Sequence, residues 1–283
     1  MFLLQLKHEL WKLFGKKRTY IGFGAFLLVQ VAVILMFRYT KAASAIRRAL
    51  EGGGYPAETF ITAGTIATQI VIPVAFLLLP LYVSLVGGDL VAKEAEDGTL
   101  RMILARPISR LRLLTLKWVA GALFSFALSL MLGAFGWLLA SFWFPQGDLF
   151  AIQVETGGPA GGFAIFTQSE GQWRYLAAHL LLATKAISVL SLAFLFSCFN
   201  MKPAAATILA LSVMFVNVIL MNIPWFADYK TWFITHHLNL WQWMFLQRPP
   251  VERMLESLCL LLGYNVTFFA IGAAAFQVRD IKS

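Results

Sequence analysis

Residues 88–117 read GDLVAKEAEDGTLRMILARPISRLRLLTLK, in which six Lys or Arg residues follow and interleave with acidic ones. On either side, Thr59–Gly88 and Trp118–Gly147 contain no Asp, Glu, Lys or Arg. A charged segment between two apolar segments of that length is typical of a loop that joins two membrane-spanning helices. The stretch therefore predicts an all-α membrane protein with a charged loop between two of its spans.

The composition supports a membrane protein. Hydrophobic residues make up 59% of the 283 residues and charged residues 13%, against about 45–50% and about 25% in ordinary soluble domains. A bilayer core about 30 Å thick is crossed by about 20 apolar helical residues. Six stretches of the single domain 1–283 meet that length, and they lie near 19–37, 59–88, 113–144, 176–199, 203–223 and 257–278.

The distribution of Lys and Arg predicts that both termini lie in the cytoplasm. With this orientation fourteen basic residues lie on the cytoplasmic side and eight on the outer side, as the positive-inside rule requires. Four basic residues between Arg38 and Arg48 oppose it. The formal charge of +9 does not indicate nucleic acid, because the basic residues lie beside apolar segments rather than on one soluble face.

Residues 1–17 carry apolar side chains at helical spacing among lysines. They predict an amphipathic helix in the membrane interface, where Trp11 and Phe14 would contact lipid; the alternative is a solvated tail. In the second outer loop, two β-prone runs flank Gly157–Gly162, which predicts a hairpin or, alternatively, a flexible loop. Pro73 and Pro80 predict a bend in the second span, and the aromatic residues of 224–256 predict an interface belt.

Within the charged loop, Asp97 or Thr99 is expected to cap a new helix. Leu100, Ile103 and Leu104 follow at i, i+3 and i+4 and so share one face. The helix is expected to end at Arg106-Pro107, because the residue before proline disfavours the helical conformation, and Ser109 caps the next helix. The loop thus contains a short amphipathic helix over 97–107.

This pattern resembles the permease subunits of ABC-2 type transporters. The segments that match are Glu96-Asp-Gly-Thr-Leu100, Arg106-Pro-Ile-Ser-Arg110 and Lys117. The six spans and the N-terminal helix are similar too, and the length is similar to that of the nitrous-oxide reductase maturation transporter permease.

The resemblance implies that 97–107 is a cytoplasmic coupling helix between spans two and three, seated in a cleft of a separate ATPase. Leu100, Ile103 and Leu104 would form the docking face, flanked by Gly98, Thr99 and Pro107. Polar contacts would come from Glu94, Asp97, Arg101, Arg106 and Arg110. Two permeases, most simply a homodimer, would work with two ATPase copies that bind ATP and Mg. The alternative is a solvated basic loop.

The chain has no G-x-x-x-x-G-K-[ST] segment, so ATP hydrolysis is expected in another subunit rather than in this chain. We expect no metal site, because His236-His237 has no nearby Cys and no defined carboxylate partner. Lys185 lies inside the fourth span, where a charge is costly; a place in the substrate path and a structural pairing are the two readings.

The leading hypothesis is a multi-pass permease in a bacterial or archaeal cytoplasmic membrane, moving a substrate that the sequence does not specify. The rival hypothesis is a membrane-embedded enzyme or a non-transporting anchor that recruits a cytosolic protein.

Overall fold

Six helices in the part of the chain that the structure describes are long and apolar enough to cross a membrane, as predicted. The structure is a computed structural model, and it describes residues 2–105, 108–152 and 162–279. The six are α2 (Lys17–Tyr39), the continuous run Ala63–Glu96, α8 (Arg110–Trp143), α9 (Gln168–Cys198), α10 (Pro203–Asn222) and α12 (Val251–Val278).

In two of these helices, charged residues beyond the apolar stretch are held by ion pairs. α9 begins at Gln168 rather than near 176, and Arg174 pairs there with Glu170 at 2.9 Å. The run Ala63–Glu96 continues past Gly88, where buried Asp89 forms an ion pair with Arg18 of α2. Charges that the apolar pattern placed outside the spans therefore belong to the helices.

The second membrane-length helix is a run of three segments. α5 (Ala63–Pro73) is followed by a π-helical segment, Val74–Leu78, and then by α6 (Leu79–Glu96). Proline removes a backbone hydrogen bond and crowds the preceding turn. A wider, π-helical turn lies between Pro73 and Pro80, the two residues that predicted a bend.

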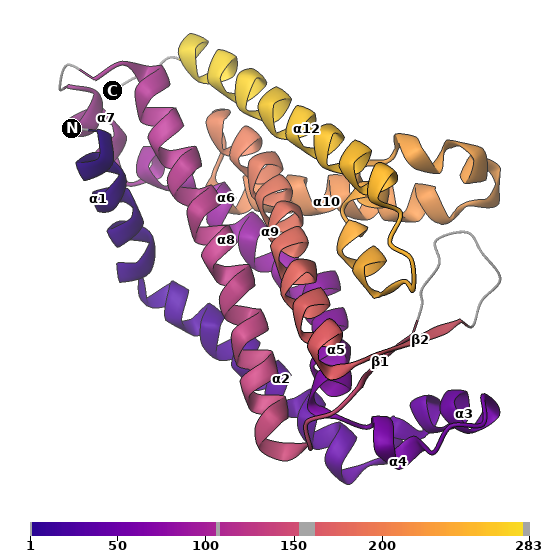
Figure 1. The fold of residues 1–283 in the computed structure, drawn as a ribbon. Coiled ribbons are helices and arrows are strands. Elements are labelled where there is room, and N and C mark those ends of the chain that lie inside the picture. The colour runs from indigo at the N-terminus through magenta and orange to yellow at the C-terminus, as the bar shows by residue number, and fades with distance from the viewer. Residues whose placement is uncertain (1, 106–107, 153–161, 280–283) are drawn as a thin grey trace.

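α9 lies at the centre of the fold (Figure 1), and it packs against α6, α8, α10 and α12. In the most apolar stretch of α9, 72% of the residues are buried in the protein. The corresponding share is 17% in α2 and in α10, whose surfaces are therefore available to lipid. Gly87 of α6 permits a close approach to the α9 backbone: a Cβ at this position would lie 2.6 Å from the Leu190 carbonyl oxygen. Small residues allow membrane helices to pack at such short distances.

The end of the fold opposite α7 (Thr99–Leu104) carries the predicted hairpin (Figure 1). Strands β1 (Leu149–Ile152) and β2 (Phe163–Phe166) pair antiparallel, with Leu149 opposite Phe166. Beside them lie a 3-10 turn, Lys41–Ala43, and the helices α3 (Ser44–Gly52) and α4 (Ala57–Phe60). Phe150 of β1 joins Ile46, Leu50 and Ala57 in a small second core.

Short helices make up the segment between α10 and α12. They are the 3-10 helix Pro224–Trp232, α11 (Ile234–His237) and the 3-10 helix Leu240–Phe245. Trp225 and Trp232 are exposed, as in the predicted aromatic belt, whereas Trp241 is buried. Arg174 holds this segment to α9 by donating to the carbonyl oxygens of Met244, Leu246 and Gln247.

Candidate functional site

The charged loop contains the short helix α7, which begins after Gly98. Gly98 has φ +73°, a left-handed conformation that glycine adopts without a steric penalty. The expected side-chain cap is absent: Asp97 pairs with Lys93 at 3.1 Å, and Thr99 is itself the first helical residue. Backbone geometry at Gly98 therefore makes the turn from α6 into α7.

The apolar stripe of α7 faces the protein itself. Leu100 is 1% exposed, and Ile103 and Leu104 are partly buried against the main core. Met102 points the other way and is 67% exposed. The predicted docking residues thus hold α7 in place, and Met102, beside the exposed Arg101, is the apolar side chain that α7 presents outward.

The segment after α7 attaches α8 to α12. Arg106 and Pro107 lie outside the described residues. Ser109 caps α8, as predicted, by accepting from the Arg112 backbone N–H at 3.3 Å. The Arg110 guanidinium donates to three carbonyl oxygens at the end of α12, those of Phe276, Gln277 and Arg279, at 2.9–3.1 Å. Such carbonyls have no partner within their own helix, so Arg110 caps α12.

A buried lysine links three helices at the α7 end of the fold. Lys117 of α8 is 1% exposed, and its ammonium lies 2.7 Å from a Glu94 oxygen of α6 and 3.3 Å from a Glu9 oxygen. Glu9 belongs to α1 (Phe2–Gly15), the predicted N-terminal helix. Lys12 pairs with both carboxylates, at 2.8 and 3.4 Å. We call Glu9, Lys12, Glu94 and Lys117 the ion cluster.

The ion cluster borders an open cleft of about 600 Å³. Six cationic and four anionic side chains line this cleft. They are Lys12, Lys16, Lys17, Arg18, Lys93 and Lys117, with Glu9, Asp89, Glu94 and Asp97. The cleft is therefore polar and carries an excess of positive charge.

Glu9 is a site residue that the sequence pattern alone did not single out. It lies between Leu6 and Leu13 at helical spacing, on the face that α1 buries. An acidic residue on a buried face requires a cationic partner, since an unpaired buried charge is costly. The position of Glu9 on the apolar face was the available signal, and Lys117 is the partner.

Acidification is expected to weaken the attachment of α1. Burial raises the pKa of Glu9, but the ammonium groups of Lys117 and Lys12 outweigh burial, and the pKa lies below its ordinary value of 4.5. The stabilisation is therefore fully present above about pH 4.5 and is lost as the pH falls through the lower folded-state pKa. The unfolding temperatures of the wild type and of Glu9→Gln should therefore converge once the pH lies below the folded-state pKa of Glu9. A constant difference between them down to about pH 3 would contradict the assignment.

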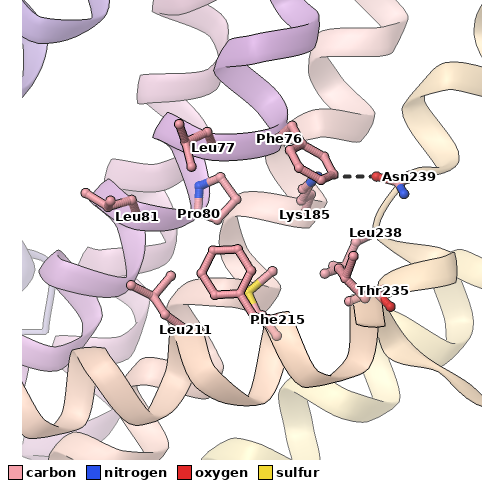
Figure 2. A pocket seen from close by; sticks show the side chains of 12 residues that line it. Phe76, Leu77, Pro80, Leu81, Lys185, Leu211, Phe215, Thr235, Leu238 and Asn239 are labelled. Atoms are coloured by element: carbon pink, nitrogen blue, oxygen red, sulfur yellow. Dashed lines mark hydrogen bonds between the residues drawn. The ribbon is translucent and has the colours of Figure 1, made fainter. Parts of the chain in front are cut away.

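Lys185 lines a second cavity, which lies between α6, α9, α10 and the segment after α11 (Figure 2). Its side chain is buried, and Nζ donates to Oδ1 of Asn239 at 3.3 Å. The cavity measures about 60 Å³, enough for a few water-sized groups. The other lining residues are Phe76, Leu77, Pro80, Leu81, Leu211, Met214, Phe215, Val218, Thr235 and Leu238.

The longer α9 places Lys185 deeper in its helix than expected. Lys185 lies about 25 Å along the axis from Gln168 and about 20 Å from Cys198, at 1.5 Å per residue. A lysine side chain is far too short to carry its ammonium group to either end. Lys185 and Asn239 meet because the segment after α11 folds back onto α9, a contact that sequence periodicity does not reveal.

His236 and His237 lie in surroundings typical of structural residues, where His237 contacts other groups of the protein. His237 Nδ1 lies 2.9 Å from Ser257 Oγ, and its Nε2 lies 2.9 Å from the Thr231 carbonyl oxygen. Burial, and after it the nearby His237 and Lys230, lower the pKa of His236. In the described ranges no group of three His, Cys, Asp or Glu residues is placed to hold a metal ion.

The described residues form a helical protein with six helices of membrane-spanning length, a short helix between two of them, and a buried lysine in a cavity. The chain belongs to the family described as protein of unknown function (DUF2705), which it matches over residues 25–282. No curated protein matches the chain.

Proposed function

We propose that the protein is the transmembrane permease subunit of an ABC-2 type ATP-binding cassette transporter. A separate ATPase subunit, present in two copies and carrying ATP and Mg, binds at α7. Two permeases, most simply two copies of this chain, form the substrate path in a bacterial or archaeal cytoplasmic membrane. The substrate itself is a molecule that the sequence and fold do not specify.

The observation that carries the proposal is α7 itself. It is a short helix between two breaks, joining the membrane-length helices that end at Glu96 and begin at Arg110. The Glu-Asp-Gly-Thr-Leu sequence of residues 96–100 leads from α6 into α7, and Met102 is the exposed apolar residue of α7. An exposed apolar side chain beside a basic one suits insertion into a groove of another protein.

The arrangement of the ends supports a cytoplasmic position for α7. α1, α7 and the C-terminal end of α12 lie at the same end of the fold (Figure 1). The six basic side chains that line the cleft lie at this end. Basic residues at this end support a cytoplasmic position under the positive-inside rule.

The contacts of α7 indicate how force reaches the membrane. Leu100 anchors α7 in the main core, and Glu94, which precedes it at the end of α6, belongs to the ion cluster. Closure of the ATPase dimer on ATP displaces α7, and α6, α8 and α1 move with it because Lys117 joins all three. Tilting of these helices changes access from one membrane side to the other.

Met102→Glu is expected to weaken binding of the ATPase at least about tenfold. The substitution places a charge at the centre of the proposed contact, and central contact residues dominate binding energy. Met102 is 67% exposed, so folding should be unaffected. The measurement is co-purification with a separate ATPase that bears G-x-x-x-x-G-K-[ST], with Met102→Leu as the matched control.

Unchanged ATPase binding by Met102→Glu would show that the docking face is wrongly assigned. Failure of the wild type to bind an ATPase bearing G-x-x-x-x-G-K-[ST] would contradict the proposed permease function itself. Leu104→Glu is a poorer test, because Leu104 packs against the protein's own core and its replacement disturbs folding.

A further inference from the structure

Three basic side chains are buried in the described part of the chain, and two of them are fully compensated. Lys117 faces the Glu9 and Glu94 carboxylates. Arg174 pairs with Glu170, donates to three carbonyl oxygens and lies over the Phe166 ring. Lys185 has one amide oxygen at 3.3 Å and, within the ranges that the structure describes, no ion pair. None of the acidic residues that the structure describes supplies an anion to this site, which leaves it open to an anion from outside the chain.

Apart from Lys185, Thr235 and Asn239, the cavity is lined by apolar residues, and its rim faces outward. Phe76 and Leu77 are 60% and 53% exposed, and Phe215 and Leu81 are 51% and 46% exposed. These residues lie on the membrane-length helices Ala63–Glu96 and α10. Apolar residues exposed on such helices contact lipid chains, so the cavity opens sideways toward the bilayer.

The helix wall at this cavity is irregular. Phe76 and Leu77 belong to the π-helical segment Val74–Leu78, and Pro80 follows it closely in the lining. π-helical turns within helices are rare and occur frequently at functional sites. The π-helical turn and the uncompensated Lys185 thus line the same cavity. The helix geometry and the missing ion pair are independent observations.

We propose that the Lys185 cavity binds an amphiphile with a small anionic headgroup, which enters sideways from the bilayer between α6 and α10. The ammonium of Lys185 holds one oxygen of the headgroup. The Asn239 amide accepts from Lys185 through Oδ1 and has two N–H groups on Nδ2 for a second oxygen (Figure 2).

The size of the cavity sets how much of the molecule enters. About 60 Å³ holds a headgroup and the first chain carbons, not a whole lipid. The rest of the acyl chain lies along Leu77, Leu81 and Phe215, on the lipid side of the rim. The site goes beyond the permease function and does not rest on it, because binding needs neither the ATPase nor transport.

The test is equilibrium binding of radiolabelled oleate to the full chain in nanodiscs of zwitterionic lipid. The wild type should bind oleate at least about tenfold more tightly than methyl oleate, which has the same chain and no charge. Acetate and inorganic phosphate should fail to displace oleate, because they lack the chain. Equal binding of oleate and methyl oleate, or displacement by acetate, overturns the proposal without any variant.

Variants then locate the site. Lys185→Met should lose the preference for oleate, and Lys185→Arg should keep most of it. Leu81→Trp fills the rim and should weaken oleate binding, whereas Ile208→Trp, also exposed to lipid but outside the cavity, should not. Wild-type oleate affinity in a folded Lys185→Met variant overturns the assignment to this cavity. None of these results depends on whether an ATPase binds α7.

Discussion

Replacing Lys117 by Met is expected to lower the free energy of unfolding by about 3–5 kcal/mol, as for other buried ion pairs that lose one partner. The substitution leaves the Glu9 and Glu94 carboxylates facing each other at 14% and 19% side-chain exposure. Lys12, which is 49% exposed, is too hydrated to replace the lost charge. Thermal unfolding of the purified chain in one detergent measures the effect.

Two controls separate charge from packing. Lys12→Met removes a cation of the same cluster that water already solvates, and should cost at most about 1 kcal/mol. Glu9→Gln and Glu94→Gln, combined with Lys117→Met, remove the uncompensated carboxylates and should restore much of the stability. Equal losses for Lys117→Met and Lys12→Met would show that the ion cluster contributes little.

Gly87→Val is expected to be the other severe substitution. A Cβ at Gly87 would lie 2.6 Å from the Leu190 carbonyl oxygen and 2.9 Å from the Ala193 Cβ, so no flexible side chain can move aside. α6 and α9 must separate along the most central contact of the fold. The cost should reach about 3 kcal/mol, the upper end of ordinary overpacking, and should appear as a lower yield of monodisperse protein.

Gly263→Val is the matched control for Gly87→Val. Gly263 also lies within a membrane-length helix, α12, but a Cβ added there would meet no atom within 4 Å. The two variants add the same side chain, so their difference reports helix packing alone. A well-folded Gly87→Val protein would mean that α6 and α9 do not approach as closely as described.

The fold was predictable from the sequence where local pattern decides it. Apolar length predicted the six helices of membrane-spanning length found in the described ranges, and β-prone runs around Gly157–Gly162 indicated the hairpin. The beginning of α9 was not predictable from apolar length, because Glu170 and Arg174 compensate each other within about one helical turn. A hydropathy scale scores Glu170 and Arg174 separately, as two charged residues. As an ion pair, however, they are compatible with a helix that enters the membrane.

The candidate sites were predictable only in part. Helical spacing placed Leu100, Ile103 and Leu104 on one face, but spacing does not say whether that face meets the same chain or another. The position of Lys185 was visible in the sequence, whereas its contact with Asn239 depends on an irregular segment folding back onto α9. Contacts between residues distant in sequence require the three-dimensional structure.

The ion cluster also has a consequence for biosynthesis. Lys117 follows Glu9 by 108 residues, so at about 5–20 residues per second the ribosome needs about 5–20 s to deliver the partner of Glu9. During that interval α1 has Glu9 and the exposed Lys12, but not the buried Lys117 that ties Glu9 to α8. α1 is therefore synthesised early but attached late. Its attachment through Lys117 requires α8, the third membrane-length helix, to be in place.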